Sequence, residues 1–116
     1  MTPEVTIFDK IVRGEIPSTK VFEDEEVLAF KDINPAAPVH VLLIPKYRDG
    51  LDRLSLAEDR HRELLGHMMV SVPKVAKAAG LSDYRVVIND GETAGQTVFH
   101  LHMHILGGGH LKWPPT

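Results

Sequence analysis

The chain has 116 residues, of which 43% are hydrophobic and 25% charged, a composition that suits one compact domain spanning residues 1–116. Its formal net charge of −3 gives no basic field for a nucleic-acid backbone or an anionic membrane, and the absence of cysteine excludes disulfides, thiol catalysis and thiolate metal sites. Because the sequence shows no signal-like apolar segment and no run of about 20 apolar residues, it predicts a soluble, cytoplasmic protein that binds neither polymeric nucleic acid nor membranes.

The first predicted element is a short amphipathic helix within residues 3–15. Apolar residues recur there at helical spacing, and Gly14 and Pro17 end the pattern. Alternating and continuous apolar runs then predict three strands, at residues 21–25, 25–32 and 39–46. The last of these is almost entirely apolar, so we expect it to be largely buried.

A long helix is predicted next. Ser55 and Glu58 have the spacing of a capping box, and one apolar face continues from there until Gly80. Pro73 lies inside this helix, where it removes a backbone donor, so we expect a kink or a break there. Two further strands are predicted, at residues 84–90 and 98–106, around a glycine-containing loop, and the tail from about residue 107 has no regular pattern.

Four of the seven histidines lie between residues 100 and 110, and three of them alternate with apolar residues. In a strand, side chains two residues apart share a face and lie roughly 6.6 Å from each other. His100, His102 and His104 are therefore expected on one face of the last strand, opposite the apolar side chains between them. His110 lies outside this row and receives no catalytic assignment.

Three interpretations of the row remain open on the residues alone. The imidazoles satisfy hydrogen bonds in a structural role, or they share a metal ion, since histidines at i and i+2 are able to ligate zinc together. In the third, one imidazole attacks an electrophilic phosphorus while its other ring nitrogen is held by an acceptor, and its neighbours move protons or neutralise phosphate oxygens. The third interpretation predicts an anion-binding loop nearby.

The segment just before the row provides a candidate for that loop. Gly91 and Gly95 permit tight turns that aim backbone N–H groups inward, and Gln96 and Thr97 add side-chain donors. A plain connection between two strands explains the same residues. Upstream, His40 is equally consistent with an ordinary strand histidine, Asp32 with a turn cap, and the pair Ile7 and Phe8 with core packing.

In combination, these segments resemble the histidine triad family, whose signature His-x-His-x-His followed by apolar residues is matched at residues 100–106. The resemblance covers nearly the whole chain, in IFDKIVRGEIP, VLAFKDINPAAPVHVLLIPK, LLGH, RVVINDG, GQTVFHLHMHILGG and the terminal WPP. It is closest to the Hint branch, the purine nucleoside phosphoramidases. It implies an α+β fold with a five-stranded antiparallel sheet and two helices per subunit, in a homodimer that joins two sheets into one.

The resemblance also implies catalytic roles for the matching residues. His102 would be the nucleophile that forms a nucleotidyl-histidine intermediate, and His100 would orient it through its backbone carbonyl. His40 and His104 would lie beside the scissile phosphate as proton-relay and charge-stabilising groups. The Hint branch often has serine where Thr97 stands, and threonine retains the hydroxyl that is able to bond the leaving-group atom.

Binding roles follow from the same resemblance. Asp32 would hold the ribose hydroxyls, Gly95 and Gln96 would belong to the phosphate-contacting segment, and Asn89 would buttress it. Trp113 would reach the partner subunit's active site through the C-terminal tail. The purine pocket would be formed by Ile7, Phe8, Ile11, Phe30, Ile33 and Leu42.

The sequence therefore predicts a hydrolase that cleaves the P–N bond of adenosine or guanosine 5′-phosphoramidates without a metal or other cofactor. Its only implied partners are the purine nucleotide substrate and a second copy of the chain. Dinucleoside polyphosphate hydrolysis or nucleotidyl transfer would use the same nucleophile with another leaving group. A metal-dependent hydrolase and a nucleotide-binding interaction module remain the alternatives from other classes.

Overall fold

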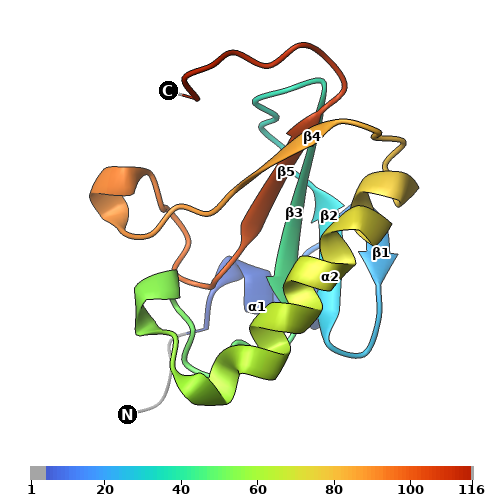
Figure 1. The fold of residues 1–116 in the computed structure, drawn as a ribbon. Helices are drawn as coiled ribbons and strands as arrows, with labels where there is room; N and C mark the ends of the chain where they lie inside the picture. Colours follow the sequence, from blue (N-terminus) through green and yellow to red (C-terminus); the bar gives the residue numbers. More distant parts are fainter. Residues whose placement is uncertain (1–4, 116) are drawn as a thin grey trace.

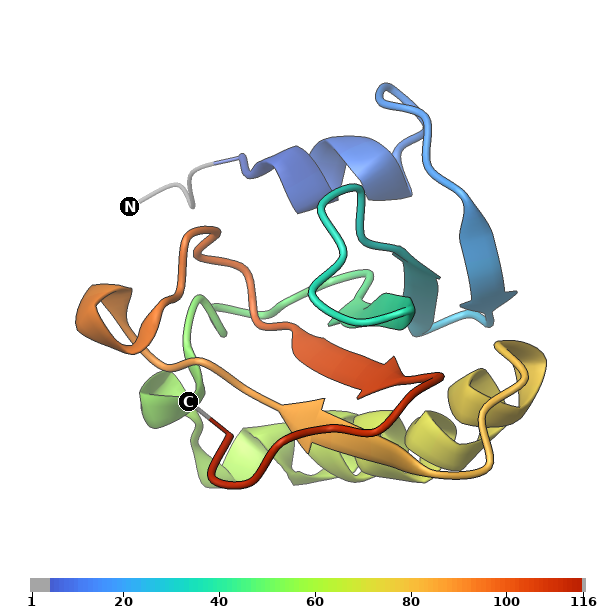
Figure 2. The ribbon, with the colours of Figure 1, turned by 90° about the horizontal axis from the view of Figure 1, so that it is seen from above.

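The computed structural model describes residues 5–115 and contains one five-stranded antiparallel sheet with a helix on each face (Figures 1 and 2). The strands are paired in the order β1-β2-β3-β5-β4. Their bounds are β1 (Lys20–Glu23), β2 (Val27–Lys31), β3 (Val39–Pro45), β4 (Tyr84–Val87) and β5 (Met103–Gly107). The predicted α+β fold class is thus confirmed, and β3 is buried over most of its length as its apolar sequence predicts.

The first helix, α1 (Ile7–Val12), is shorter than the predicted helix, and residues Pro3 and Glu4 of that prediction lie outside the described part of the chain. It begins with a reciprocal cap in which Asp9 N–H donates to the Thr6 hydroxyl and Thr6 N–H donates to the Asp9 carboxylate. Its apolar side packs on one face of the sheet and forms a small core of Phe8, Ile11, Leu28, Phe30, Leu42 and Ile44.

The second helix, α2 (Arg62–Ala78), packs on the opposite face and forms the larger core with alternate residues of β2, β3 and β5. The predicted cap at Ser55 is wrong, because Ser55 lies in a single 3-10 turn and its N–H donates to Asp90. Of the kink or break expected at Pro73, the break is wrong, because the helix continues through this residue, and the kink stays a prediction. Pro73 and Met69, whose carbonyl loses the donor, are both exposed, and exposure lets water take the missing bond.

The strand that carries the histidine row is shorter than predicted. It begins at Met103, so only His104 lies within β5. His100 lies in a bend before it, and His102 lies in the irregular chain between, where the Leu101 N–H donates to the Leu51 carbonyl. The alternation nevertheless continues through this segment, and the apolar residues Leu101, Met103 and Ile105 point into the α2 core. Phe99 is the exception to the predicted apolar face, because it remains partly exposed.

No helix within residues 5–115 has the length and apolar character needed to cross a membrane. After β5 the chain has no regular structure as far as residue 115 and runs back toward the edge strand β4 (Figure 2). There the guanidinium of Arg85 lies 5.8 Å from the ring centre of Trp113.

Candidate active site

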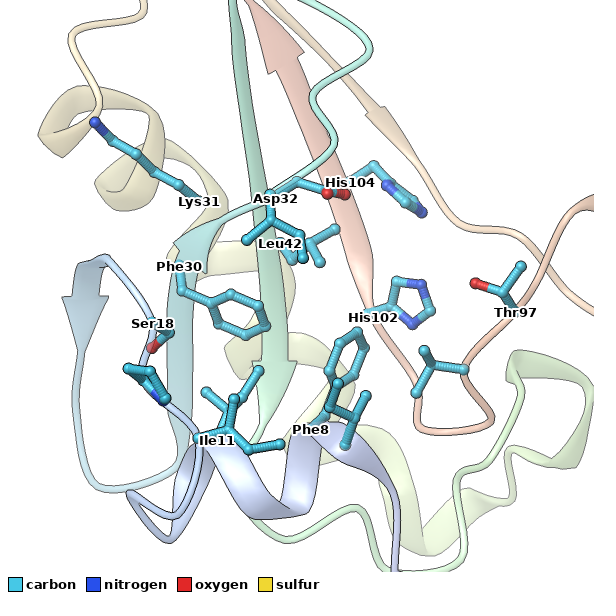
Figure 3. Close-up of a pocket in the computed structure, with 15 residues that line it drawn as sticks. Phe8, Ile11, Ser18, Phe30, Lys31, Asp32, Leu42, Thr97, His102 and His104 are labelled. Carbon is cyan, nitrogen blue, oxygen red and sulfur yellow. The ribbon is translucent and has the colours of Figure 1, made fainter.

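A cavity of about 240 Å³ lies between α1 and the sheet (Figure 3). Its walls come from segments far apart in the sequence: α1, the end of β2, β3, and the chain leading into β5. All six residues predicted for a purine pocket line it, namely Ile7, Phe8, Ile11, Phe30, Ile33 and Leu42. Asp32, Thr97, His102 and His104 line the same cavity, so one apolar space is bordered by a carboxylate, a hydroxyl and two imidazoles.

His102 is held with one ring nitrogen occupied. Its Nδ1 lies 2.8 Å from the backbone oxygen of His100, and a carbonyl oxygen only accepts hydrogen bonds, so the proton of neutral His102 is on Nδ1. Nε2 consequently carries the lone pair. The edge of the ring meets Phe8 at a centroid distance of 5.0 Å, which fixes its orientation at the cavity wall (Figure 3). This arrangement presents a nucleophilic nitrogen to anything bound in the cavity.

His40 and His104 form a directed pair. The Ala36 N–H donates to Nδ1 of His40 at 3.0 Å, so neutral His40 carries its proton on Nε2. That Nε2 donates to Nδ1 of His104 at 2.8 Å, which places the His104 proton on its own Nε2. Nε2 of His104 is buried and has no hydrogen-bond partner among residues 5–115. A buried donor without a partner is costly, and an acceptor bound in the cavity would relieve that cost.

His100 lies behind His102 and is fully buried. Its Nε2 donates to the backbone oxygen of Pro45 at 2.9 Å, and its Nδ1 lies 3.1 Å from the Thr6 hydroxyl. The ring therefore joins β3 and the start of α1. Its own carbonyl, which accepts from His102, is immobilised by the same contacts.

Burial keeps these histidines neutral. It lowers the pKa of His40, His100 and His102 below the usual histidine value. The opposing effects are smaller and come from Asp32 on His40, from the Pro45 carbonyl on His100, and from the His100 carbonyl and then Asp32 on His102. Burial, with repulsion from His102 and His40, lowers the pKa of His104 to about 4. A neutral imidazole is the form that attacks phosphorus, so the electrostatics agree with the hydrogen bonding.

The Asp32 carboxylate caps the turn after β2, where its Oδ1 accepts the Asn34 N–H. Its Oδ2 lies 3.5 Å from Nε2 of His40, and the ligand atoms of Asp32, His40 and His104 are all within 4.8 Å of one another. The hydrogen bonds do not suit a metal there. Nε2 of His40 carries a proton because a backbone N–H occupies Nδ1, and a metal ligand needs a free lone pair at that atom.

The glycine-containing loop differs from the predicted anion cradle. The backbone N–H groups of Ala94, Gly95 and Gln96 all donate to carbonyls within the loop. The Gln96 side chain is buried and committed as well: Oε1 accepts the Gly91 N–H at 2.8 Å, and Nε2 donates to the carbonyls of Asp52 and Val98. The polar atoms of Gln96 therefore hold the loop in shape, and its contact with a phosphate stays a prediction.

Of the remaining predicted residues, some line the cavity and others lie outside it. Thr97 is exposed and reaches the cavity beside His102 (Figure 3), and the Asn89 amide lies against Gly95, 3.6 Å from where a β-carbon would stand. Ile33 lines the cavity but is 90% exposed. Trp113 is 81% exposed and is not among the residues that line this subunit's cavity.

Sequence reasoning missed a charged group behind the histidines. Arg48 and Asp9 form a 2.8 Å ion pair next to His100, and Thr6 completes the group. Thr6 and Asp9 lie at the start of α1, and Arg48 lies in the loop after β3. No local pattern identifies them, because their contacts join segments 39 or more positions apart.

The chain is similar in sequence and in fold to several known proteins. The family model described as "HIT domain" matches residues 13–111. A "14 kDa zinc-binding protein" of Zea mays is 60% identical over 95% of this chain and 87% of its own length, and "Adenylylsulfatase HINT1" of Arabidopsis thaliana is 57% identical over 95% and 76%. The crystal structure of a HIT family hydrolase from Legionella pneumophila superposes with a TM-score of 0.88 at 46% identity, covering 95% of this chain and 98% of that one.

Proposed function

The chain belongs to the HIT domain family, and we propose that it is a purine nucleoside phosphoramidase that acts through a covalent nucleotidyl-histidine. The observation that carries the proposal is the state of His102, whose Nδ1 proton is bound to the His100 carbonyl while Nε2 remains available at the cavity wall. The same cavity offers an aromatic and aliphatic space for a base, and a carboxylate at its end suits the two ribose hydroxyls.

In the first proposed step, Nε2 of His102 attacks the α-phosphorus and the P–N bond to the leaving amine breaks. The amine nitrogen gains a proton as it leaves. The His40–His104 pair supplies a donor at Nε2 of His104, and the anionic phosphate raises the tendency of the pair to hold an extra proton. Water then attacks the same phosphorus and gives a proton back to the His40–His104 pair, while the P–Nε2 bond breaks. This step releases the nucleoside monophosphate and returns His102 to its neutral form.

A second leaving group is favoured by one relative. The Arabidopsis protein is named an adenylylsulfatase, and its 57% identity covers 95% of this chain. Adenylyl sulfate offers the same α-phosphorus to His102, but sulfate leaves as a stable anion and needs no proton. The proposed nucleophile thus serves both substrates. They differ in whether the leaving group needs a proton from the His40–His104 pair.

The resemblance to zinc-binding relatives does not extend to a metal-dependent mechanism in this proposal. Zinc at Asp32, His40 and His104 would require the His40 proton to move to Nδ1, where it would face the Ala36 N–H. We therefore assign every proposed step to the side chains themselves.

We also propose a homodimer, supported by two features of the surface. β4 is an edge strand, and an open edge is a ready site for pairing with another strand. Trp113 exposes 81% of its surface and lies near this edge, beside Arg85. A second copy that covers β4 would explain an exposed tryptophan and would bring it near the partner's site, as the family resemblance implies.

The proposed reaction is tested by intact-mass measurement during turnover of an adenosine 5′-phosphoramidate. The unmodified protein should show an added nucleotidyl group, and His102→Ala should lose both the adduct and hydrolysis, with kcat falling by about 10⁴-fold or more. His110→Ala is the matched control, since His110 is exposed and outside the cavity. Unchanged hydrolysis in His102→Ala, with normal circular dichroism, would refute the nucleophile.

A further inference from the structure

A group of charged side chains lies behind His100, on the side away from the cavity. The Asp9 carboxylate from α1 and the Arg48 guanidinium from the loop after β3 pair at 2.8 Å, between Oδ2 and Nη1. Both approach Nδ1 of His100, with Asp9 Oδ1 at 3.5 Å and Arg48 Nη1 at 3.5 Å. Arg48 is buried, and its Nε lies 2.9 Å from Oδ1 of the half-exposed Asp52.

These charges act on His100 in opposite directions. Burial, the largest effect, lowers the pKa of His100, and Arg48 and His102 lower it further. The Pro45 carbonyl and Asp9 raise the pKa, because a carboxylate beside Nδ1 favours a proton there. Asp9, Arg48 and His102 are the charged or titratable groups that meet the ring from α1, from the loop after β3 and from its own segment, and Arg48 is the only permanent cation among them.

We propose that Asp9 and Arg48 are positioning residues for His102. Arg48 neutralises the Asp9 carboxylate, which would otherwise favour a proton on the buried His100 ring, and the pair thereby holds the carbonyl that orients the nucleophile. The Asp9 carboxylate accepts a hydrogen bond from Arg48, and Nδ1 of His100 remains an acceptor for the Thr6 hydroxyl. The ring then donates only from Nε2, to Pro45, and its backbone stays in place.

The alternative charge state shows why the pair matters. Without the Arg48 cation, Asp9 would face Nδ1 of His100 alone and would stabilise an imidazolium. A positive charge on His100 would lower the basicity of His102. A new donor at Nδ1 of His100 would pull the ring toward α1 and away from its present contacts. The segment of chain that carries the His100 carbonyl would move with the ring.

The pair acts on reactivity and not on nucleotide binding. Neither Asp9 nor Arg48 lines the cavity that holds the proposed purine site. Loss of the pair should consequently slow nucleotidyl transfer to His102 while AMP binds as before. This kinetic consequence rests on the proposed function, whereas the charge state of His100 does not.

The test compares Arg48→Gln, Arg48→Lys and the double variant Asp9→Asn/Arg48→Gln in the full chain. Nitrogen NMR of the imidazoles gives the tautomer and pKa of His100 and His102, single-turnover mixing gives the nucleotidylation rate, and titration gives the AMP Kd. Val75→Ala is the matched control for lost stability, since Val75 is fully buried in α2 on the other side of the sheet.

Arg48→Gln should raise the pKa of His100 by about one unit or more and slow nucleotidylation by about tenfold to a hundredfold, with AMP Kd unchanged. Arg48→Lys and the double variant should each return the pKa of His100 toward its original value, and Val75→Ala should not move it. An unaltered His100 pKa and tautomer in Arg48→Gln overturns the inference. If the parent protein hydrolyses no phosphoramidate, the proposed function fails, and the NMR comparison still decides the role of the pair.

Discussion

Nε2 of His40 and Nδ1 of His104 lie 2.8 Å apart, on the adjacent strands β3 and β5, although 64 positions separate the two residues in the chain. Because the backbone N–H of Ala36 occupies the other nitrogen of His40, the hydrogen bond runs in one direction, toward His104. The chain of donors ends at Nε2 of His104, a buried group with no partner in the described part of the chain. The backbone thereby selects which imidazole nitrogen of His104 carries the proton.

This relation predicts a leaving-group effect. His40→Ala removes the donor to His104, so its Nε2 proton is no longer fixed. Hydrolysis of an alkylamine phosphoramidate should fall by about 10²-fold or more, because the amine needs a proton. Adenylyl sulfate should lose much less, because sulfate leaves as an anion. Steady-state kcat for both substrates measures the ratio, and equal losses would show that the pair does not act on the leaving group.

The lowered histidine pKa values predict acid sensitivity of folding. A histidine with a native pKa below its unfolded value of about 6.5 binds a proton more readily when unfolded, so its contribution is intact above that pH and is lost as the pH falls. With a native pKa of about 4, His104 alone would contribute up to about 3 kcal/mol, lost between pH 6.5 and 4. Urea unfolding at pH 7.5, 5.5 and 4.5 measures this loss of unfolding free energy.

His104→Asn is the comparison for that experiment, since it should show a shallower fall in unfolding free energy over the same interval. Glu23 and Asp24 also have lowered pKa values, but their stabilisation is lost below the usual carboxyl range and so at lower pH.

The reaction rate should also fall as the pH is lowered. Because the pKa of His102 is lowered by burial, the acid limb of kcat/KM should lie below pH 6.5.

Gln96 should prove a stability residue. Gln96→Ala leaves the Gly91 N–H and two backbone carbonyls without a partner in a buried setting, which should lower the unfolding free energy by about 1–3 kcal/mol. Thr93→Ala, an exposed change in the same loop, should stay within about 0.5 kcal/mol of the parent. Thermal or urea unfolding distinguishes the two variants. An unchanged stability in Gln96→Ala would contradict the structural role and favour the predicted contact of Gln96 with a bound phosphate.

Metal removal should leave the reaction intact. The Ala36 hydrogen bond keeps a proton on Nε2 of His40, so zinc has no preformed ligand there. After exhaustive chelation and dialysis, the phosphoramidase rate should equal that of the untreated protein, with elemental analysis confirming that zinc is gone. Activity that is lost and then recovered with one equivalent of zinc per chain would contradict the tautomer argument.

The proposed dimer is tested by complementation between two differently impaired subunits. If Trp113 contributes to the partner's site, Trp113→Ala should raise KM with little effect on unfolding, because the side chain is exposed in its own subunit. Mixing Trp113→Ala with His102→Ala and allowing exchange should restore one complete site per mixed dimer. Light scattering reports the assembly state. A mixture no more active than Trp113→Ala alone would place the tryptophan's effect within its own subunit.

The strands and helices were predictable because each carries a local pattern. The apolar run of β3 and the spacing of α1 and α2 follow from burial on one or two faces. The errors arose where a tertiary contact replaced the local signal. Ser55 donates to Asp90 instead of capping a helix. In the chain before Met103, His100 contacts Thr6 and the Pro45 carbonyl through its side chain instead of extending the ladder of β5.

The sequence by itself determined the types and spacing of the histidines, and alternation predicted which of them share a face. Only the tertiary structure decided how each is protonated, because the groups that set the tautomers are backbone atoms of Ala36, Pro45 and the row itself. A backbone N–H or carbonyl is present at every position, so no residue pattern marks the ones that will be used. Burial, which lowers the pKa values, likewise exists only once α1 closes over the sheet.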